Sequence, residues 1–505
     1  MLNLLQYSKT VRRRRAALVL LVAVIGGCAQ KDDGVIRFGL ATPPVTLDPR
    51  FATDATSYRL TRLIYQALVD FDATHRPVSA LADWEQLSPL HYRFQLRASQ
   101  QFHDGSALRA DDVVATYRSI LDPRTASPHR GSLANIKSIE TPSVLVVDFF
   151  LTQADPLFPG LLVIGIMSAE IVDADRNRLE NPIGSGPFAL DGPPSETRLR
   201  LRRVVDGQKI EFVTVRDATV RALKLLHGEI DLIQGSMTPE LVDWLDHNDR
   251  IAAEQRPGTT FTYLGFNLND PEVGVLRVRQ AIAHAVDRRS LTKHMFGSRA
   301  RLAEGIFTPG HWAGHPELDA IEYDPARARE LLAEMGYSDL NPLQLSYKTS
   351  SDHFRLRIAT AIQDQLAQVG IEVKISSYDW GTFYADVKAG RFQMYSLSWV
   401  GLKLPDIFRY AFHSLSVPPT GANRGRYNAE RIDRMIEQAE ATTDLNERAD
   451  LYRNIQQQLL IDLPYVPLWY EDTTVIVRDS IVGYDTGIDG HYDGLASARR
   501  VQLNE

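Results

Sequence analysis

Hydrophobic residues along the chain alternate between the spacing of strands and the spacing of helices. The clearest strand-like runs are residues 35–40, 92–96, 144–151, 230–233, 261–267 and 371–375. The clearest amphipathic helical stretches are residues 56–68, 110–120, 218–226, 278–285, 326–335 and 354–369. Gly370 ends the last of these helices just before a strand. Repeated helix-to-strand steps of this kind predict α/β architecture.

Length and composition describe a water-soluble protein with more than one core. The chain has 505 residues, and single hydrophobic cores rarely grow beyond roughly 250–300 residues. Hydrophobic residues make up 44% of the chain and charged residues 24%, which is ordinary for soluble domains. We therefore expect several packed domains.

The N-terminus has the pattern of an export signal. Lys9 and the arginines at 12–15 precede the apolar stretch 16–25, which ends at Gly26, Gly27 and Cys28. That stretch is much shorter than the roughly 20 residues of a membrane-spanning helix. Residues 25–28 resemble a bacterial lipobox, so we expect residues 1–27 to be a cleaved lipoprotein signal peptide and 28–34 a lipidated tether. The alternative is a plain signal peptide with a chance cysteine.

Charge and cysteine content narrow the classes of partner. Cys28 is the only cysteine, so the chain forms no internal disulfide and no cysteine-based metal site. Removal of residues 1–27 takes away five basic residues and no acidic one, which changes the formal net charge from −7 to −12. This acidic charge makes nucleic acid an improbable partner, and contact with a membrane is expected mainly through acyl chains.

Residue patterns typical of enzymes are missing. The sequence has no Gly-x-Ser-x-Gly, His-Glu-x-x-His or P-loop motif. His311 and His315 are the closest histidine pair, but they lie in a loop rich in Trp and Gly, where this spacing places no two ligands together. The neighbouring Asp111 and Asp112 read as surface charge. We predict no catalytic residue, no metal site and no cofactor.

Aromatic residues gather near the predicted strand and turn after residue 375. They are Tyr378, Trp380, Phe383, Tyr384, Tyr395 and Trp399. Such a group can line an apolar ligand pocket, or it can form the core of one domain. Sequence alone leaves both readings open.

A series of motifs gives the chain a resemblance to a known family. The most distinctive are residues 92–97 (Tyr-Arg-Phe-Gln-Leu-Arg), 102–105 (Phe-His-Asp-Gly) and 110–113 (Ala-Asp-Asp-Val). Residues 46–49, 64–68, 184–188, 228–231, 278–288 and 323–325 add further similar points in the same order. Together they resemble the bacterial extracellular solute-binding proteins of peptide and nickel ABC transporters, over nearly the whole mature chain.

The resemblance implies a hinged fold of two α/β lobes, of the type II-like periplasmic-binding-protein class, with an additional inserted domain. Carried onto this chain, domain I takes residues 35–55, 181–267 and 472–505. Domain II, the insertion, takes 56–180, and domain III takes 268–471. In this family the lobes close around the ligand, and crossing strands join them.

The same resemblance implies where a ligand binds. Peptide-binding members usually hold the ligand ammonium with an aspartate three residues after the tryptophan that matches Trp399. Here Gly401 is followed by Leu402 at that position and then Lys403, and the nearest acid is Asp406. A buried ammonium without a carboxylate partner is costly. Either Asp406 replaces the missing acid, or the ligand has no free amine.

An arginine is the expected partner of a ligand carboxylate. Arg357 lies near the position where some peptide binders place one, and Arg355 is equally suited, since the guanidinium fork matches a carboxylate. An exposed helix arginine is the alternative reading. Residues 423–426 (Asn-Arg-Gly-Arg) form a second basic loop, which could meet an anionic group of the ligand, although solvated surface is the role we expect. Tyr378 and Trp380 complete the expected ligand-binding set with Trp399.

The resemblance implies a binding protein and not an enzyme. We expect a monomeric lipoprotein in the periplasm, anchored through Cys28, that captures a small peptide and delivers it to an inner-membrane ABC permease. Ala29 follows the lipidated cysteine, which leaves the inner face of the outer membrane open as the anchoring site. One alternative keeps the fold with a metal chelate, an opine-like anion or a muropeptide as ligand. The other is an envelope enzyme or chaperone.

Overall fold

The computed structural model describes residues 33–72, 75–172, 182–297, 299–338, 340–487 and 489–501. The predicted signal peptide and Cys28 lie outside these residues. Residues 36–505 form one compact unit. Within the described ranges, no helix is long and apolar enough to cross a membrane.

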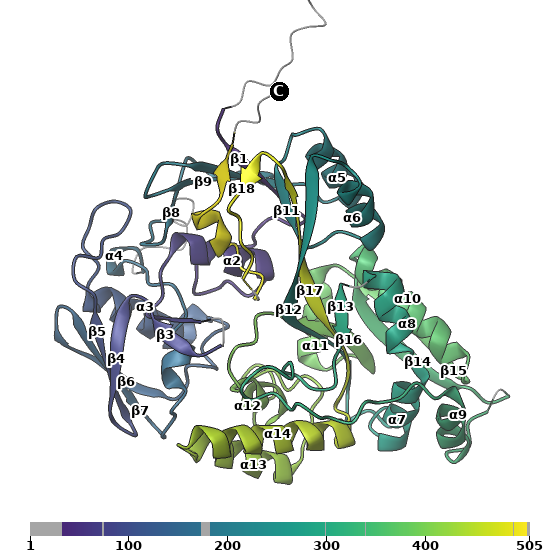
Figure 1. The fold of residues 1–505 in the computed structure, drawn as a ribbon. Coiled ribbons are helices and arrows are strands. Elements are labelled where there is room, and N and C mark those ends of the chain that lie inside the picture. Colours follow the sequence, from purple (N-terminus) through teal and green to yellow (C-terminus); the bar gives the residue numbers. More distant parts are fainter. Residues whose placement is uncertain are drawn as a thin grey trace, which may run out of the picture. The chain divides into compact units, whose positions relative to one another are not determined.

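An 11-stranded mixed sheet runs through this unit (Figure 1). Its order is β15 (Ile371–Tyr378), β14 (Leu343–Ser350), β16 (Met394–Trp399), β12 (Ile251–Phe266), β17 (Tyr465–Arg478), β11 (Leu232–Gln234), β1 (Ile36–Leu40), β10 (Lys209–Thr214), β9 (Arg198–Arg203) and β8 (Phe188–Leu190). β13 (Ala300–Leu302) pairs with β17 beside this path. The parallel pairs β14–β15 and β1–β10 agree with the α/β architecture predicted from the sequence.

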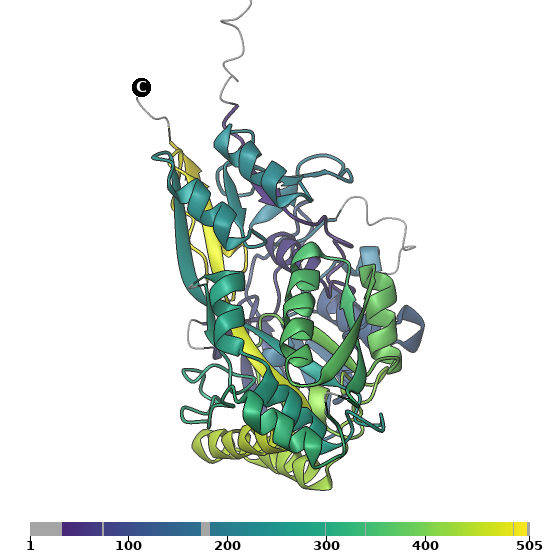
Figure 2. The same ribbon diagram turned by 90° about the vertical axis from the view of Figure 1, so that its right-hand side faces the viewer.

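Strands β12 and β17 are long enough to belong to both ends of the sheet, and Figure 2 shows them side by side. The first part of β12 pairs with the part of β17 that also pairs with β11. Its last part, Phe261–Phe266, pairs with β16. Between these parts the register shifts after Arg256, where a Cβ on Gly258 would lie 2.2 Å from the carbonyl oxygen of Glu471. The two strands thus cross from one half of the sheet to the other at a bulge.

A separate four-stranded antiparallel sheet has the order β4 (Ala82–Ser88), β5 (His91–Leu96), β7 (Val146–Leu151) and β6 (Ile136–Ser143). Helix α3 (Ala110–Leu121) packs on this sheet. Every second residue of β5 is buried, namely Tyr92, Phe94 and Leu96. The short strands β2 (Val69–Phe71) and β3 (Pro77–Ser79) form a hairpin beside it. The strand, turn and helix predicted over 92–120 are confirmed as β5 and α3.

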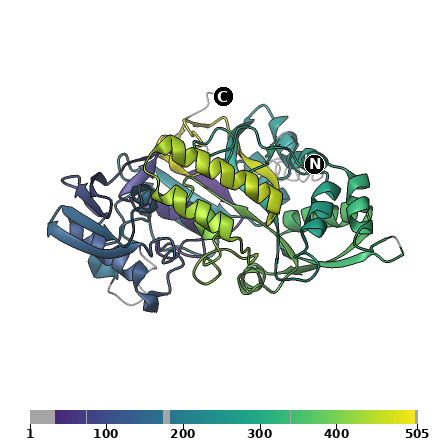
Figure 3. The same cartoon turned by 90° about the horizontal axis from the view of Figure 1, so that it is seen from below.

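The remaining helices are α2 (Ala55–Ile64), α4 (Ala169–Val172), α5 (Ala218–Leu226), α6 (Pro239–Asp246), α7 (Leu276–Ala285), α8 (Arg288–Phe296), α9 (Pro325–Ala333), α10 (His353–Ala367), α11 (Trp380–Ala389), α12 (Ile407–Phe412), α13 (Glu430–Ala441) and α14 (Leu445–Asp462). α13 and α14 lie side by side, as Figure 3 shows. α2 is shorter than predicted, because its chain becomes extended at Tyr65 and the carbonyl of Ile64 accepts from Gly186 instead.

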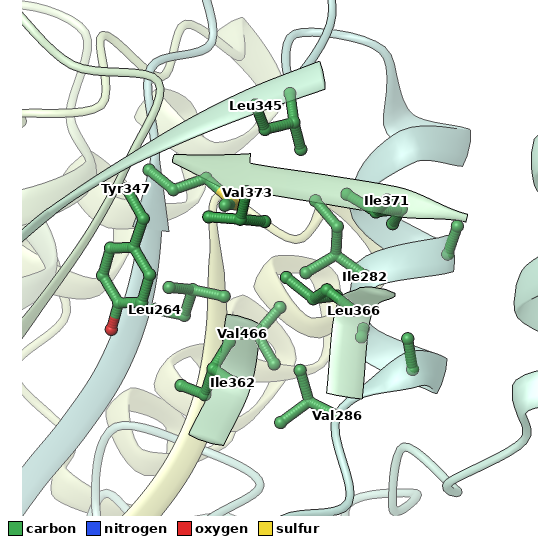
Figure 4. Packing of buried hydrophobic residues seen from close by; sticks show 14 of the residues in the cluster. Leu264, Ile282, Val286, Leu345, Tyr347, Ile362, Leu366, Ile371, Val373 and Val466 are labelled. Carbon is green, nitrogen blue, oxygen red and sulfur yellow. The ribbon is translucent and has the colours of Figure 1, made fainter. Parts of the chain in front are cut away.

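Hydrophobic side chains are buried in several cores. One surrounds α10, β14 and β15, where Ile362 and Leu366 of the helix meet Leu345 and Val373 of the strands (Figure 4). A second core lies against the four-stranded sheet, and its side chains come from the segment between Leu68 and Ile166. A third, with Ile36, Phe38 and Phe212, packs on β1 and β10. The third core also contains Leu60, Leu63 and Ile64 of α2, and the domain boundaries stay a prediction.

Candidate functional site

The segment that follows β16 carries most of the residues predicted to meet a ligand. Trp399 is the last residue of β16, where it pairs with Phe261 of β12. Gly401 has a φ of +67°, which a glycine adopts without strain, and the chain turns there before Lys403 and α12. Leu402 is half-buried and packs against the aromatic core around Tyr395 and Phe408. The crossing strand β12 therefore positions this segment.

Trp399 contacts aromatic side chains from two other elements. Its ring stacks at 6.4 Å from Tyr263 of β12 and meets Tyr410 of α12 edge-on at 6.1 Å. Its indole N–H is buried and has no hydrogen-bond partner among the described residues. The core reading is confirmed for Tyr395 and Phe383, which are buried in the core around β16. Trp399 and Tyr384 are half-buried, and a role of these rings in lining a ligand pocket stays a prediction.

Arg424 is the cation of this aromatic group, and it is buried with 5% of its surface exposed. Its guanidinium carbon lies 4.6 Å from the Trp399 ring centroid and 5.4 Å from that of Tyr384. Its two terminal nitrogens donate to the hydroxyls of Tyr263 and Tyr384, each at 3.1 Å. Our expectation of a solvated basic loop at 423–426 is therefore wrong for Arg424, because side chains from β12, α11 and β16 enclose it.

Trp380 and Tyr378 are both exposed, and in the contacts of the described residues only Trp380 joins this aromatic group. Trp380, the first residue of α11, stacks on Tyr384 at 5.4 Å and is half exposed. Tyr378 ends β15, and the ammonium of Lys348 lies 5.4 Å from its ring. The structure thus brings Trp399, Trp380 and Tyr384 together around Arg424, a residue that the sequence analysis had left on the surface.

Lys403 is buried and already paired. Its ammonium lies 2.8 Å from a carboxylate oxygen of Asp489 and 4.9 Å from the ring centroid of Phe71. Burial opposes ionisation of Asp489, but His491 and Lys403 outweigh it and hold the pKa of that carboxyl well below its ordinary value. The pair joins three distant segments of the chain. A role of Lys403 in ligand contact stays a prediction.

Asp406 precedes α12 and makes no capping hydrogen bond through its side chain. Burial and the neighbouring Asp155 raise its pKa to about 7. Burial also raises the pKa of Asp155. These two acids come from segments far apart in the sequence, and each disfavours the charge of the other. A cationic group placed beside Asp406 would relieve that repulsion.

The two candidate arginines on α10 have different surroundings. Arg357 is exposed, and its closest acidic partner is Glu240 at 3.3 Å, itself on the surface. Arg355 is more buried and donates to Glu471 at 2.9 Å, beside the point where β12 and β17 cross. Glu471 also accepts from the hydroxyl of Thr262 on β12. Neither arginine belongs to the aromatic group around Trp399 in the contacts that the structure shows.

In the part of the chain that the structure describes, histidine and acidic side chains do not gather into a metal site. His311 is buried, and one ring nitrogen lies 3.0 Å from the carbonyl oxygen of Lys403. Over the described ranges, no group of three or more His, Cys, Asp or Glu residues is arranged to hold a metal ion. A cavity of about 430 Å³ lies elsewhere, along α8, and is lined by residues such as Arg289, Lys293 and Tyr323. It contains none of the predicted ligand-binding residues.

Comparison with known proteins decides the family. The model of the bacterial extracellular solute-binding proteins, family 5 Middle, matches residues 75–416, which is more than half of the chain. The chain belongs to this family of solute-binding proteins. The match includes the segment from Trp399 to Asp406, and it confirms the resemblance that the sequence motifs indicated.

Individual relatives extend the likeness to nearly the full length. The dipeptide-binding protein of Escherichia coli K12 is 27% identical over 489 residues, covering 87% of this chain and 90% of that protein. A periplasmic binding protein of Helicobacter pylori, solved with the peptide STSA, has a TM-score of 0.83 and 26% identity and covers 92% of this chain and 98% of its own. An Agrobacterium protein solved with agropinic acid has a TM-score of 0.81 and 24% identity, covering 93% and 99%. The fold is that of the two-lobed periplasmic binding proteins.

Proposed function

We propose that this solute-binding protein captures peptides in the cell envelope and delivers them to an ABC permease of the inner membrane. The observation that carries the proposal is the full-length likeness to a dipeptide-binding protein, 27% over 489 residues. The aromatic group around Trp399 supports it, since stacked rings with few charges suit the side chains of varied peptides.

Lobe closure is the proposed mechanism of capture. β12 and β17 are continuous across the bulge at Gly258, so a small change in backbone angles there moves the two ends of the sheet relative to each other. A ligand shifts this equilibrium only by contacts that it makes in the closed state alone. Trp399 and Gly401 lie just beyond the crossing, where such contacts are expected to form.

The contacts proposed within the site differ in kind. Trp399, Tyr378 and Trp380 offer ring faces, and Gly401 and Leu402 offer backbone and apolar surface. Asp406 is the proposed acceptor for a ligand ammonium, because its carboxylate has no cationic partner in the ion pairs of the described residues. Recognition of the peptide backbone with loose side-chain pockets gives broad specificity.

Thermal unfolding of the refolded mature protein tests the proposal. Ligands that bind only the native state raise its melting temperature. We expect at least one class of di- to pentapeptides with a free N-terminus to raise it, and the same peptides with an acetylated N-terminus to raise it less if Asp406 holds the amine. Absence of any shift across the peptide panel would contradict the proposal.

A second candidate ligand is an anionic, non-peptide solute such as an opine. Leu402 stands where the amine-binding acid is expected, and the buried cation Arg424 lies beside Trp399. The neighbour solved with agropinic acid shares the fold. An opine that raised the melting temperature where no peptide did would favour this candidate.

We further propose that the mature protein is a monomer anchored by lipid on Cys28. The basic residues, apolar stretch and Gly-Gly-Cys sequence at 12–28 support the proposal, and a family of extracellular solute-binding proteins requires export. More than one acyl chain is needed for stable attachment. The anchor keeps the receptor near the membrane, where the permease lies.

A further inference from the structure

Arg424 is a buried cation whose partners are neutral. Among the described residues, its contacts are two tyrosine hydroxyls and two ring faces. In the part of the chain that the structure describes, no carboxylate lies within ion-pair distance of it. Two other buried arginines are held by backbone oxygens: Arg279 donates to four backbone carbonyls, and Arg288 donates to carbonyls and to Glu304. Among the contacts of the described residues, Arg424 has only the two tyrosine hydroxyls as acceptors. A guanidinium stays charged throughout the physiological range, so this position holds an uncompensated positive charge.

The loop fixes the arginine before any ligand arrives. Asn423 donates to the carbonyls of His413 and Tyr427 and accepts from the backbone N–H of Tyr427. The carbonyl of Gly425 accepts from the backbone N–H of Leu268, and a Cβ at Gly425 would lie 2.6 Å from the carbonyl oxygen of Phe266. The loop is therefore docked on the end of β12, which holds the guanidinium in place.

The surroundings of Arg424 add donors and positive charge rather than acceptors. The indole N–H of Trp399 is a second buried donor without a partner among the described residues. The ammonium of Lys388 lies 5.1 Å from the ring of Tyr384, so that ring has a cation near it in addition to Arg424. Meanwhile Leu402 takes the place of an acid in the adjacent turn. A group that accepts hydrogen bonds and carries negative charge is what these side chains lack.

We propose that Arg424, stacked between Trp399 and Tyr384, binds a carboxylate of the transported solute. The planar fork of the guanidinium presents two parallel donors, which match the two oxygens of a carboxylate. Tyr263 and Tyr384 orient the fork, and the two rings exclude water from it, so the carboxylate meets a desolvated cation. This inference rests on the proposed binding of a small solute at the Trp399 segment and names the group that is recognised there.

Isothermal titration calorimetry of the refolded protein tests the inference with one peptide in two forms. The probe is a peptide that raises the melting temperature, compared with its C-terminal amide. We expect the free acid to bind roughly tenfold or more tightly, as for a charge-assisted hydrogen-bonded pair. Arg424→Gln should remove most of this difference, and Arg424→Lys should restore part of it because the charge remains without the fork.

Arg426→Gln is the matched control, because it removes the same charge two residues away, where Arg426 donates to backbone carbonyls. It should leave the preference for the acid intact. Equal binding of acid and amide by the unaltered protein would overturn the inference while the proposed peptide receptor stands, and that comparison needs no variant to fold. A preference that persists in Arg424→Gln would overturn it too.

If no peptide binds, a titration with octopine distinguishes failure of the carboxylate inference from failure of the proposed peptide binding. Octopine binding that Arg424→Gln weakens roughly tenfold would uphold the inference and overturn the peptide proposal. Failure of both peptides and octopine to bind would overturn the inference together with the proposed function.

Discussion

The ammonium nitrogen of Lys403 lies 2.8 Å from a carboxylate oxygen of Asp489, and both side chains are largely shielded from water. Phe71 covers the ammonium. Because 86 residues separate Lys403 from Asp489 and more than 300 separate it from Phe71, this contact ties together segments that the sequence assigns to three different domains. The structure gives Lys403 a partner within the protein itself.

Replacement of Lys403 by methionine should therefore lower stability. It leaves the charge of Asp489 buried without its ammonium, which costs about 3 kcal/mol in comparable buried pairs. Urea unfolding at pH 7 measures the loss, and Asp489→Leu in the same protein should recover most of it. Lys374→Met, at an exposed position on β15, should change stability by less than about 0.5 kcal/mol. An unchanged stability in Lys403→Met would show that the pair with Asp489 does not hold these segments together.

Arg355 and Arg357 form a natural comparison on one helix. Arg355→Ala should cost about 2 kcal/mol, because it leaves Glu471 part-buried beside the crossing strands without its cation. Arg357→Ala should cost less than about 0.5 kcal/mol, since its pair with Glu240 is exposed. Urea unfolding of the two variants checks this difference. Equal losses of unfolding free energy would show that the Arg355–Glu471 pair stabilises the crossing strands no more than an exposed ion pair does.

The Arg355–Glu471 pair also has a predicted pH dependence. Burial opposes the charge of Glu471, but Arg355 outweighs it and lowers the pKa of that carboxyl. An acid whose folded pKa is depressed contributes stability above its unfolded pKa, near 4.3, and loses it as the pH falls through the folded value. The destabilisation by Arg355→Ala should thus shrink between pH 5 and pH 3, as measured by urea unfolding.

Asp406 should behave in the opposite way. Its pKa is raised to about 7, so the folded state binds a proton that the unfolded state releases near pH 4, and stability is lost as the pH rises between these values. Asp406→Asn should then stabilise the protein by about 2 kcal/mol at pH 8 and have little effect at pH 4. Asp386→Asn should destabilise at pH 8, because Lys348 and Arg391 pair with that carboxylate and lower its pKa.

Ligand binding gives a second readout for Asp406. If its carboxylate holds the amine of a peptide, affinity should fall as the pH drops from 8 to 6, because protonation removes the charge that the ammonium needs. Calorimetric titrations at the two pH values with one free-amine peptide measure this. If the peptide affinity is the same at pH 8 and pH 6, a group other than Asp406 holds the peptide amine.

Attachment through Cys28 is tested in cells. The full-length protein should appear in the membrane fraction with its mature N-terminus at an acylated Cys28, as mass spectrometry would show. Cys28→Ser should move it to the soluble periplasmic fraction or block its processing. A Cys28→Ser protein that remains membrane-bound after normal cleavage would contradict the lipoprotein assignment.

Local sequence patterns predicted those helices and strands whose formation depends mainly on residues close in sequence. Helix α10 and the strand after Gly370 follow from one amphipathic stretch and one glycine with positive φ. The alternating residues of β5 likewise place Tyr92 and Phe94 in a core. The length of β12 was missed, because Pro257 and Gly258 look like the end of a strand, and only pairing with β17 shows that the strand continues.

The candidate site was predicted in part. The family motif placed Trp399, Gly401 and Leu402, and the structure shows them together in one turn. Arg424 was named as part of a loop that could meet an anion, but it was expected at the surface. Its burial was not predicted, because Tyr263, Tyr384 and Trp399 reach it from three separate elements, and no local pattern records that convergence. An arginine between Asn423 and Gly425 in a loop with few acids was the signal available in the sequence.

Calorimetric titration of the refolded protein with a di- or tripeptide, compared between Trp399→Ala and Trp244→Ala, tests the central claim most directly. Trp244 is an exposed tryptophan on α6 and serves as the matched control. The account predicts saturable binding of one peptide per chain in the unaltered protein and in Trp244→Ala, and a loss of roughly tenfold or more in affinity in Trp399→Ala. Full peptide affinity in Trp399→Ala, or no binding of peptides by the unaltered protein, would contradict it.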